Sequence, residues 1–223
     1  MKTFQELLQV RAPKKMTLPV PLGVFIKEVK FVDIAKISPI LIEGNNPDER
    51  QLLVQEIRWT MLYHKHSKNV RMFSINAQDE QKMFKMLAIL QKEIANRYEK
   101  QHSKHYKAPH IIVFIENIEN FAITHFETLK NIFEISQKIG IYFVLSIGKI
   151  ERKHYFKHYF KLLGLCNYVL IVADNLVQRA NLLKITLQEW SDLYHQKINR
   201  ETIELPLIKT DEVQAFLKLK SAN

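Results

Sequence analysis

The stretch that decides the fold lies near the start of the chain and reads Ile40-Leu41-Ile42-Glu43-Gly44-Asn45-Asn46-Pro47-Asp48-Glu49-Arg50-Gln51. Its apolar first residues predict a buried strand, and the Gly-Asn-Asn-Pro run predicts a turn. From Glu49 onwards apolar residues recur at a helical spacing, so we expect a helix over Glu49–His64. A strand, a short turn and a helix in this order are typical of a parallel α/β sheet.

The turn can be compared with the phosphate-binding loop, whose pattern is G-x-x-x-x-G-K-[ST]. Counted from Gly44, the second glycine is replaced by Glu49, the lysine by Arg50 and the hydroxyl residue by Gln51. Such a loop holds phosphate with inward-pointing backbone N–H groups at a helix N-terminus. Pro47 lacks that N–H, and the carboxylate of Glu49 repels phosphate oxygens. Arg50 keeps a positive charge in a planar group, whereas Gln51 has no short hydroxyl for Mg²⁺. The sequence therefore predicts a degenerate nucleotide loop, made of Gly44, Asn45, Asn46, Pro47, Asp48, Glu49, Arg50 and Gln51.

On this stretch alone an ordinary turn, with Asp48 capping the next helix, explains the pattern equally well. A second segment decides between the two: Pro109-His110-Ile111-Ile112-Val113-Phe114-Ile115-Glu116-Asn117-Ile118-Glu119. Its five consecutive apolar residues predict a central strand of a parallel sheet. In an NTPase this strand ends in Asp-Glu, which support Mg²⁺ and orient the attacking water. Here the pair is Glu116-Asn117; Glu116 could still reach a metal ion, but Asn117 cannot act as a base.

Composition limits the class of protein. The chain has 223 residues, 47% of them hydrophobic, which is enough for one domain with a full core. Its apolar runs are shorter than the roughly 20 residues of a membrane helix, and its first ten residues do not read as a secretory signal. The single Cys166 fits a reducing compartment and reads as a small buried residue.

The formal net charge of +10 favours an acidic partner such as nucleic acid, anionic lipid or an acidic peptide. Two stretches are the most basic, Lys92–Lys107 and Lys149–Lys161, and both contain aromatic residues. Such mixtures can bind nucleic acid, although solvated helix faces are the commoner explanation. His154 and His158 have the spacing of a metal pair on a helix, but no third ligand accompanies them, so no metal site is predicted.

Strands and helices alternate along the chain, which predicts a mainly parallel sheet flanked by helices. Besides the elements above, we expect strands at Val29–Ile34, Asn69–Ile75, Ile141–Ile147, Tyr168–Val172 and Ile203–Ile208. We expect helices at Thr3–Val10, Gln78–Tyr98, Phe126–Ile139 (ended by Gly140), Arg152–Leu163, Asn175–Leu183, Thr186–Lys197 and Asp211–Leu219. The methionines of the second of these helices are expected in the core. We divide the chain into a lead-in helix and linker over residues 1–21 and a single domain over residues 22–223.

Three segments together resemble FtsK/SpoIIIE-type ATPase domains. Phe31–Gly44 resembles the short strand that leads into their phosphate loop, and Ala108–Asn117 resembles their second nucleotide strand. Leu129–Ser146 is similar to their sensor helix and strand, with Ser146 in the place of the sensor threonine; the glutamine that follows in the family is not kept. The resemblance spans about Lys14–Ala180. It implies a RecA/FtsK-like P-loop NTPase fold, here with degenerate nucleotide motifs.

Within that family, Phe4–Leu8 and Leu18–Gly23 resemble the lead-in to the last ATPase domain of the type VII (ESX/Ess/Yuk) secretion coupling protein. This resemblance implies a domain that recognises secreted substrates, including small helical-hairpin proteins with a C-terminal signal, or that regulates neighbouring ATPase domains. It implies a cytoplasmic part of a bacterial cell-membrane protein, in contact with the membrane only through the parent protein. No catalytic residue and no cofactor are expected, and nucleic acid is not an expected partner.

Two alternatives stay open. An active or nucleotide-binding FtsK-like ATPase would need Arg50 to replace the lysine and Glu116 to hold Mg²⁺, with ATP and Mg²⁺ as cofactors. A DNA-translocase module of the same superfamily is favoured by the net charge. For a substrate helix, the aromatic face over Tyr155–Phe160 is a candidate docking surface, although packing in the core explains it as well.

Overall fold

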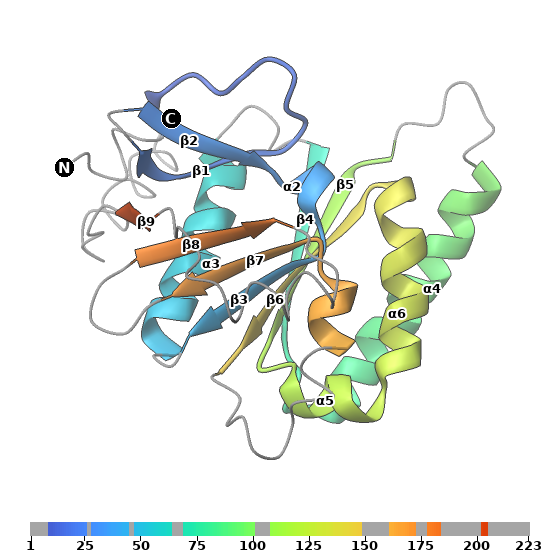
Figure 1. Ribbon diagram of the computed structural model, residues 1–223. Helices are drawn as coiled ribbons and strands as arrows, with labels where there is room; N and C mark the ends of the chain where they lie inside the picture. Colours follow the sequence, from blue (N-terminus) through green and yellow to red (C-terminus); the bar gives the residue numbers. More distant parts are fainter. Residues whose placement is uncertain are drawn as a thin grey trace, which may run out of the picture.

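The computed structural model describes residues 9–25, 28–44, 47–63, 69–100, 108–148, 161–172, 178–183 and 202–204 (Figure 1). These residues form a nine-stranded sheet in the order β2-β1-β9-β8-β7-β3-β6-β5-β4, with helices on both faces. Most of the predicted helices at Thr3–Val10 and Arg152–Leu163, and all of those at Thr186–Lys197 and Asp211–Leu219, lie outside the described residues.

One half of the sheet is parallel, which confirms the predicted class of fold. Strands β7, β3, β6, β5 and β4 are joined side by side by parallel pairing. Their bounds are Ile40–Gly44 for β3, Val70–Asn76 for β4, His110–Glu116 for β5, Ile141–Ile147 for β6 and Tyr168–Val172 for β7. Each was predicted to within about a residue, because each is a short apolar run between turn residues.

The other half is antiparallel and consists of β8 (Gln178–Leu183), β9 (Thr202–Glu204), β1 (Pro19–Phe25) and β2 (Glu28–Asp33). Here two predictions were wrong. Residues 178–183 were expected in a helix, yet they pair with β7 on one side and β9 on the other. The proline-rich stretch before residue 22 was expected to be a linker, yet β1 begins inside it.

Helices cover both faces of the parallel half (Figure 1). Helix α3 (Pro47–Tyr63) lies on one face, while α4 (Glu80–Lys100), α5 (Glu119–Thr124) and α6 (Phe126–Ser136) lie on the other. The long helices confirm the prediction; α5, the four-residue α2 (Ile34–Ile37) and the 3₁₀ turn η2 (Gln137–Ile139) were not predicted as separate elements. Among the described residues, we find no helix with the length and hydropathy to cross a bilayer.

Side chains alternate between the two faces of the sheet, as a pleated strand requires. In β3, Ile40 and Ile42 pack under α3, whereas Leu41 belongs to the core under α4 and α6. The apolar residues of β5 are all buried, which confirms a central strand. Met83 on α4 is fully buried and Cys166 is 4% exposed, so both are core residues as predicted.

A buried arginine joins α4 to the sheet. Arg97 is 2% exposed; its Nε donates to Glu93, its Nη1 to the carbonyl of Ile139 and its Nη2 to the carbonyl of Pro109. These carbonyls lie just before β6 and β5, so one guanidinium fixes the C-terminal end of α4 to the start of two strands. The turn between η2 and β6 is made by Gly140, whose φ of +79° is left-handed.

The order of the strands creates a switch point between β3 and β6. After β3 the chain forms α3, which covers one face of the sheet. After β6 it forms a helical turn over residues 161–165, whose Leu162 and Leu163 belong to the core on the opposite face. In open α/β sheets, ligands bind outside the carboxyl ends of the strands at such a point. The candidate site is therefore sought where β3 and β6 end.

Candidate functional site

Three of the predicted site residues, Gly44, Glu116 and Ser146, lie at the carboxyl ends of the neighbouring strands β3, β5 and β6. Ser146 in β6 stands in register with Ile42 of β3 on one side and with Glu116 of β5 on the other. Partners in a parallel register point to the same face, and Ile42 belongs to the core under α3. Glu116 and Ser146 are therefore neighbours on the face from which α3 starts.

The end of β5 is a tight turn. Asn117 has a φ of +54°, and its Nδ2 donates to Oδ1 of Asn76 at 3.4 Å. The carbonyl of Glu116 accepts from the N–H of Ala77, and the carbonyl of Ser146 accepts from the N–H of Ile118. Asn117 is therefore turned towards the end of β4 and away from β3.

Of the loop residues Gly44–Gln51 whose side chains are described, Arg50 is the one with a long side chain that turns inward. Its side chain is only 7% exposed, and Nη1 donates to the carbonyl of Gly44, the last residue of β3. Its Nε is buried without a hydrogen-bond partner. Pro47 and Gln51, by contrast, are exposed. Of the remaining loop residues, Asn45 and Asn46 lie outside the described residues, and Asp48 and Glu49 are described in their backbone, inside α3.

Gly148, just after β6, brings two charged side chains together. Oε1 of Glu119 accepts from the Gly148 N–H at 2.6 Å. A Cβ on Gly148 would lie 3.1 Å from that oxygen and 4.0 Å from both Nη1 and Nη2 of Arg50. The carboxylate of α5 and the guanidinium of α3 thus converge at the switch point, because residue 148 has no side chain.

Sequence reasoning missed Glu119 and Gly148. The signal was weak: a second glutamate three residues after Glu116, and a glycine directly after an apolar strand. Neither belongs to a nucleotide motif, and only the order of the strands brings them beside Arg50.

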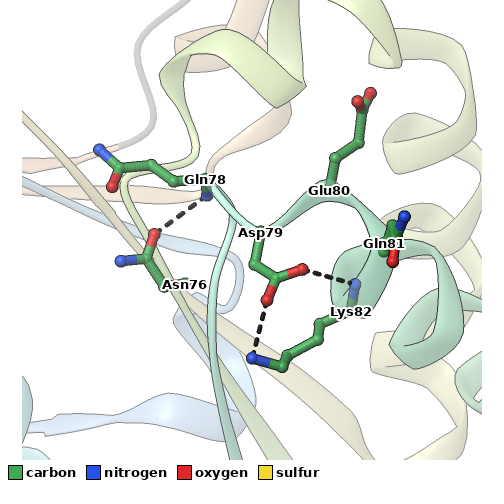
Figure 2. Close-up of a pocket in the computed structure, with 6 residues that line it drawn as sticks. All are labelled: Asn76, Gln78, Asp79, Glu80, Gln81 and Lys82. Atoms are coloured by element: carbon green, nitrogen blue, oxygen red, sulfur yellow. Dashed lines mark hydrogen bonds and ion pairs between the residues drawn. The ribbon is translucent and has the colours of Figure 1, made fainter.

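A hollow lies at the outer end of the parallel edge, where β4 leads into α4 (Figure 2). This open depression of about 630 Å³ is lined by Asn76, Gln78, Asp79, Glu80, Gln81 and Lys82. Asp79 accepts from the N–H of Lys82 and pairs with its Nζ at 2.7 Å; this hydrogen bond with Lys82 lowers the pKa of Asp79. Strand β4 is three strand spacings, about 14 Å, from β3, so the depression is separate from the switch point.

Two further groups from the sequence analysis can be compared with the structure. Among the residues that the structure describes, no three His, Cys, Asp or Glu side chains are grouped to hold a metal ion. His154, His158 and the aromatic face over Tyr155–Phe160 lie outside these residues.

This geometry defines a class of fold. A parallel sheet with its switch point beside the strand–loop–helix unit of Gly44 is the arrangement of P-loop ATPases. The sequence itself matches no family model and no curated protein.

Several solved structures share this fold. EssC of Geobacillus thermodenitrificans (ATPases 2 and 3) is similar with a TM-score of 0.65 and 12% identity, over 95% of this chain and 49% of that one. The cytoplasmic domain of the type VII secretion ATPase EccC of Thermomonospora curvata has a TM-score of 0.63 and 9% identity, over 91% and 28%. ATPases 2 and 3 of the Thermomonospora curvata EccC, solved in complex with a signal sequence peptide, have a TM-score of 0.57 and 10% identity, over 91% of this chain and 43% of that one.

The conjugation coupling protein TcpA of pCW3, solved with ATPγS, is similar with a TM-score of 0.62 and 10% identity, over 93% of this chain and 72% of that one. The chain spans less than half the length of the EssC and EccC structures. At these identities the likeness shows a shared fold, and function has to be argued from the site.

Proposed function

We propose that this chain is a catalytically degenerate FtsK/SpoIIIE-like domain of a type VII secretion coupling protein. Its role is to recognise secreted substrates or to regulate neighbouring ATPase domains of the same parent protein. In this proposal the domain includes strand β1, works on the cytoplasmic side, and uses neither a catalytic residue nor a cofactor.

The position of Arg50 is the observation that carries the proposal. In a working loop the lysine at this place reaches the β- and γ-phosphates. Here the side chain is turned back onto the Gly44 carbonyl and is buried. The glycine, the hydroxyl and the base of the working site are replaced by Glu49, Gln51 and Asn117. With these replacements, the hydroxyl that would hold Mg²⁺ and the base that would activate water are both missing from their usual places.

Substrate recognition is supported by charge and by the structural relatives. The chain carries a net charge of +10, which would attract acidic substrates and raise their rate of association. EccC of the same fold has been solved with a signal sequence peptide. We infer that a small helical-hairpin protein with a C-terminal signal would dock its amphipathic helix on this domain.

Nucleotide binding without hydrolysis is the second candidate. It is favoured by Glu116 and Ser146, which lie side by side in register at the carboxyl edge. TcpA, a protein of the same fold, was solved with ATPγS. In this alternative Glu116 would reach the metal ion, and nucleotide would serve as a structural ligand.

A combined titration tests these candidates. We expect no rise in melting temperature with millimolar Mg-ATP, because a ligand at 100 times its dissociation constant would add a readily measured 2.7 kcal/mol or so. We also expect no ATP hydrolysis above that of the Arg50→Ala variant. In a separate binding assay, a helical-hairpin substrate should bind more weakly when its C-terminal signal is deleted or when salt is raised. Hydrolysis that disappears in Arg50→Ala would overturn the proposal in favour of a working ATPase.

A further inference from the structure

We propose that Arg50 and Glu119 form an internal lock at the carboxyl ends of β3 and β6, which keeps phosphate-bearing ligands from binding at these strand ends. The inference deepens the proposed function, on which it rests, by naming the two side chains that block phosphate at the switch point. The lock consists of two contacts: Arg50 to the Gly44 carbonyl, and Glu119 to the Gly148 N–H.

The two contacts satisfy the backbone groups that a ligand would otherwise meet. Gly44 ends β3 and Gly148 follows β6, so both stand at the switch point where ligands bind in this type of sheet. The Gly148 N–H is a donor that could hold a phosphate oxygen, but it already donates to Oε1 of Glu119 at 2.6 Å. A phosphate would have to break this charge-assisted hydrogen bond before it could bind there.

The charges beside Gly148 also oppose the binding of an anion. The Glu119 oxygen and the Arg50 nitrogens lie 3.1 Å and 4.0 Å from one point beside Gly148. They are therefore nearer to each other than the roughly 8 Å over which charges interact at physiological salt. The negative charge of Glu119 offsets the positive charge of Arg50, so the net attraction for an incoming anion is small. The anion is also repelled at short range by the Glu119 carboxylate.

The lock also explains why a buried cation is tolerated at the loop. Arg50 is only 7% exposed, and its buried Nε has no hydrogen-bond partner. A charge so placed is costly unless a carboxylate is near. Glu119 brings a carboxylate from α5 to the same point beside Gly148, and its hydrogen bond with the Gly148 N–H holds it there.

The test is to neutralise the carboxylate without changing its shape. Glu119→Gln keeps an oxygen for the Gly148 N–H but leaves the charge of Arg50 unbalanced. We expect millimolar pyrophosphate to leave the melting temperature of the wild-type chain unchanged and to raise that of Glu119→Gln by about 3 °C or more. The matched control is Glu127→Gln, an exposed glutamate in the first turn of α6, which should behave like wild type.

A second measurement follows the hydrogen bond itself. In Glu119→Ala the Gly148 amide should exchange with deuterium about tenfold faster than in wild type, while Glu127→Ala leaves it unchanged. The lock is overturned if pyrophosphate stabilises wild type as much as Glu119→Gln, or if it stabilises neither, or if Gly148 exchange does not depend on Glu119. None of these results touches the proposed function, which stands or falls on the ATP hydrolysis and substrate-binding assays.

Discussion

Two buried arginines show how differently one residue type can be used in this chain. Every part of the Arg97 guanidinium has a hydrogen-bond acceptor, from Glu93 and from the carbonyls of Ile139 and Pro109. Among the described residues, Arg50 donates to one acceptor, the carbonyl of Gly44, and its buried Nε has no hydrogen-bond partner. The first pattern is that of a structural crosslink; the second leaves part of a buried guanidinium without an acceptor.

The role of Arg97 can be measured as stability. We expect Arg97→Met to lower the free energy of unfolding by about 3 kcal/mol, because it leaves buried carbonyls without donors. Arg71→Met, on the exposed side of β4, is the control and should change stability by no more than about 0.5 kcal/mol. Urea denaturation measures both, and a loss below about 1 kcal/mol for Arg97→Met would contradict a structural role.

Cys166 allows a test of burial by chemistry. Burial raises the pKa of its thiol far above the ordinary value, so the reactive thiolate is scarcely populated near pH 8. We expect the native chain to react with a thiol reagent at least about 100-fold more slowly than the chain unfolded in urea. Since Cys166 is the single cysteine, the readout is unambiguous, and rapid labelling of the folded chain would show that it is accessible.

At the scale of elements, local pattern located the parallel strands and also the antiparallel β2, which was expected at Val29–Ile34, but it missed β8 and the start of β1. The apolar runs of β3, β5 and β6 could be recognised as strands from the sequence, because strands buried on both faces are continuously hydrophobic. Gln178–Leu183 has no such pattern, and Asp174 before it reads as a helix cap; its hydrogen bonds with β7 and β9 outweigh that local preference. Strand β1 was missed because Pro19 and Pro21 read as breakers. Pro19 begins the strand and Pro21 adjoins a register shift, and proline is tolerated at both kinds of position.

Two glycines test what each element requires of its backbone. We expect Gly140→Ala to destabilise the chain by about 1 kcal/mol or more, because φ at this position is +79°. Gly164→Ala should be neutral or stabilising by up to about 1 kcal/mol, since Gly164 is helical and a Cβ there meets nothing within 4 Å. Thermal denaturation of the two variants checks the opposite signs, and equal destabilisation would refute this account.

At the scale of the whole molecule, the sequence predicts the parts of the candidate site but not their arrangement. The strand ends bearing Gly44, Glu116 and Ser146 could be located from motif order alone. The inward turn of Arg50 depends on the burial of α3, and its meeting with Glu119 depends on β6 lying between β3 and β5. Such contacts between distant segments have no local signature.

The position of β3 has a consequence for synthesis. This strand is translated before the other parallel strands, but its two neighbours in the sheet are β6 and β7, the last of them. At about 5 to 20 residues per second, a ribosome needs roughly 6 to 26 s to proceed from Gly44 to Val172. Until β6 is complete at Ile147, after roughly 5 to 21 s of that time, the apolar segment Ile40-Leu41-Ile42 has no strand to pair with, while β4 and β5 can already join each other. We therefore expect the nascent chain to be most vulnerable to aggregation, and most dependent on chaperones, in the interval before Ile147 emerges.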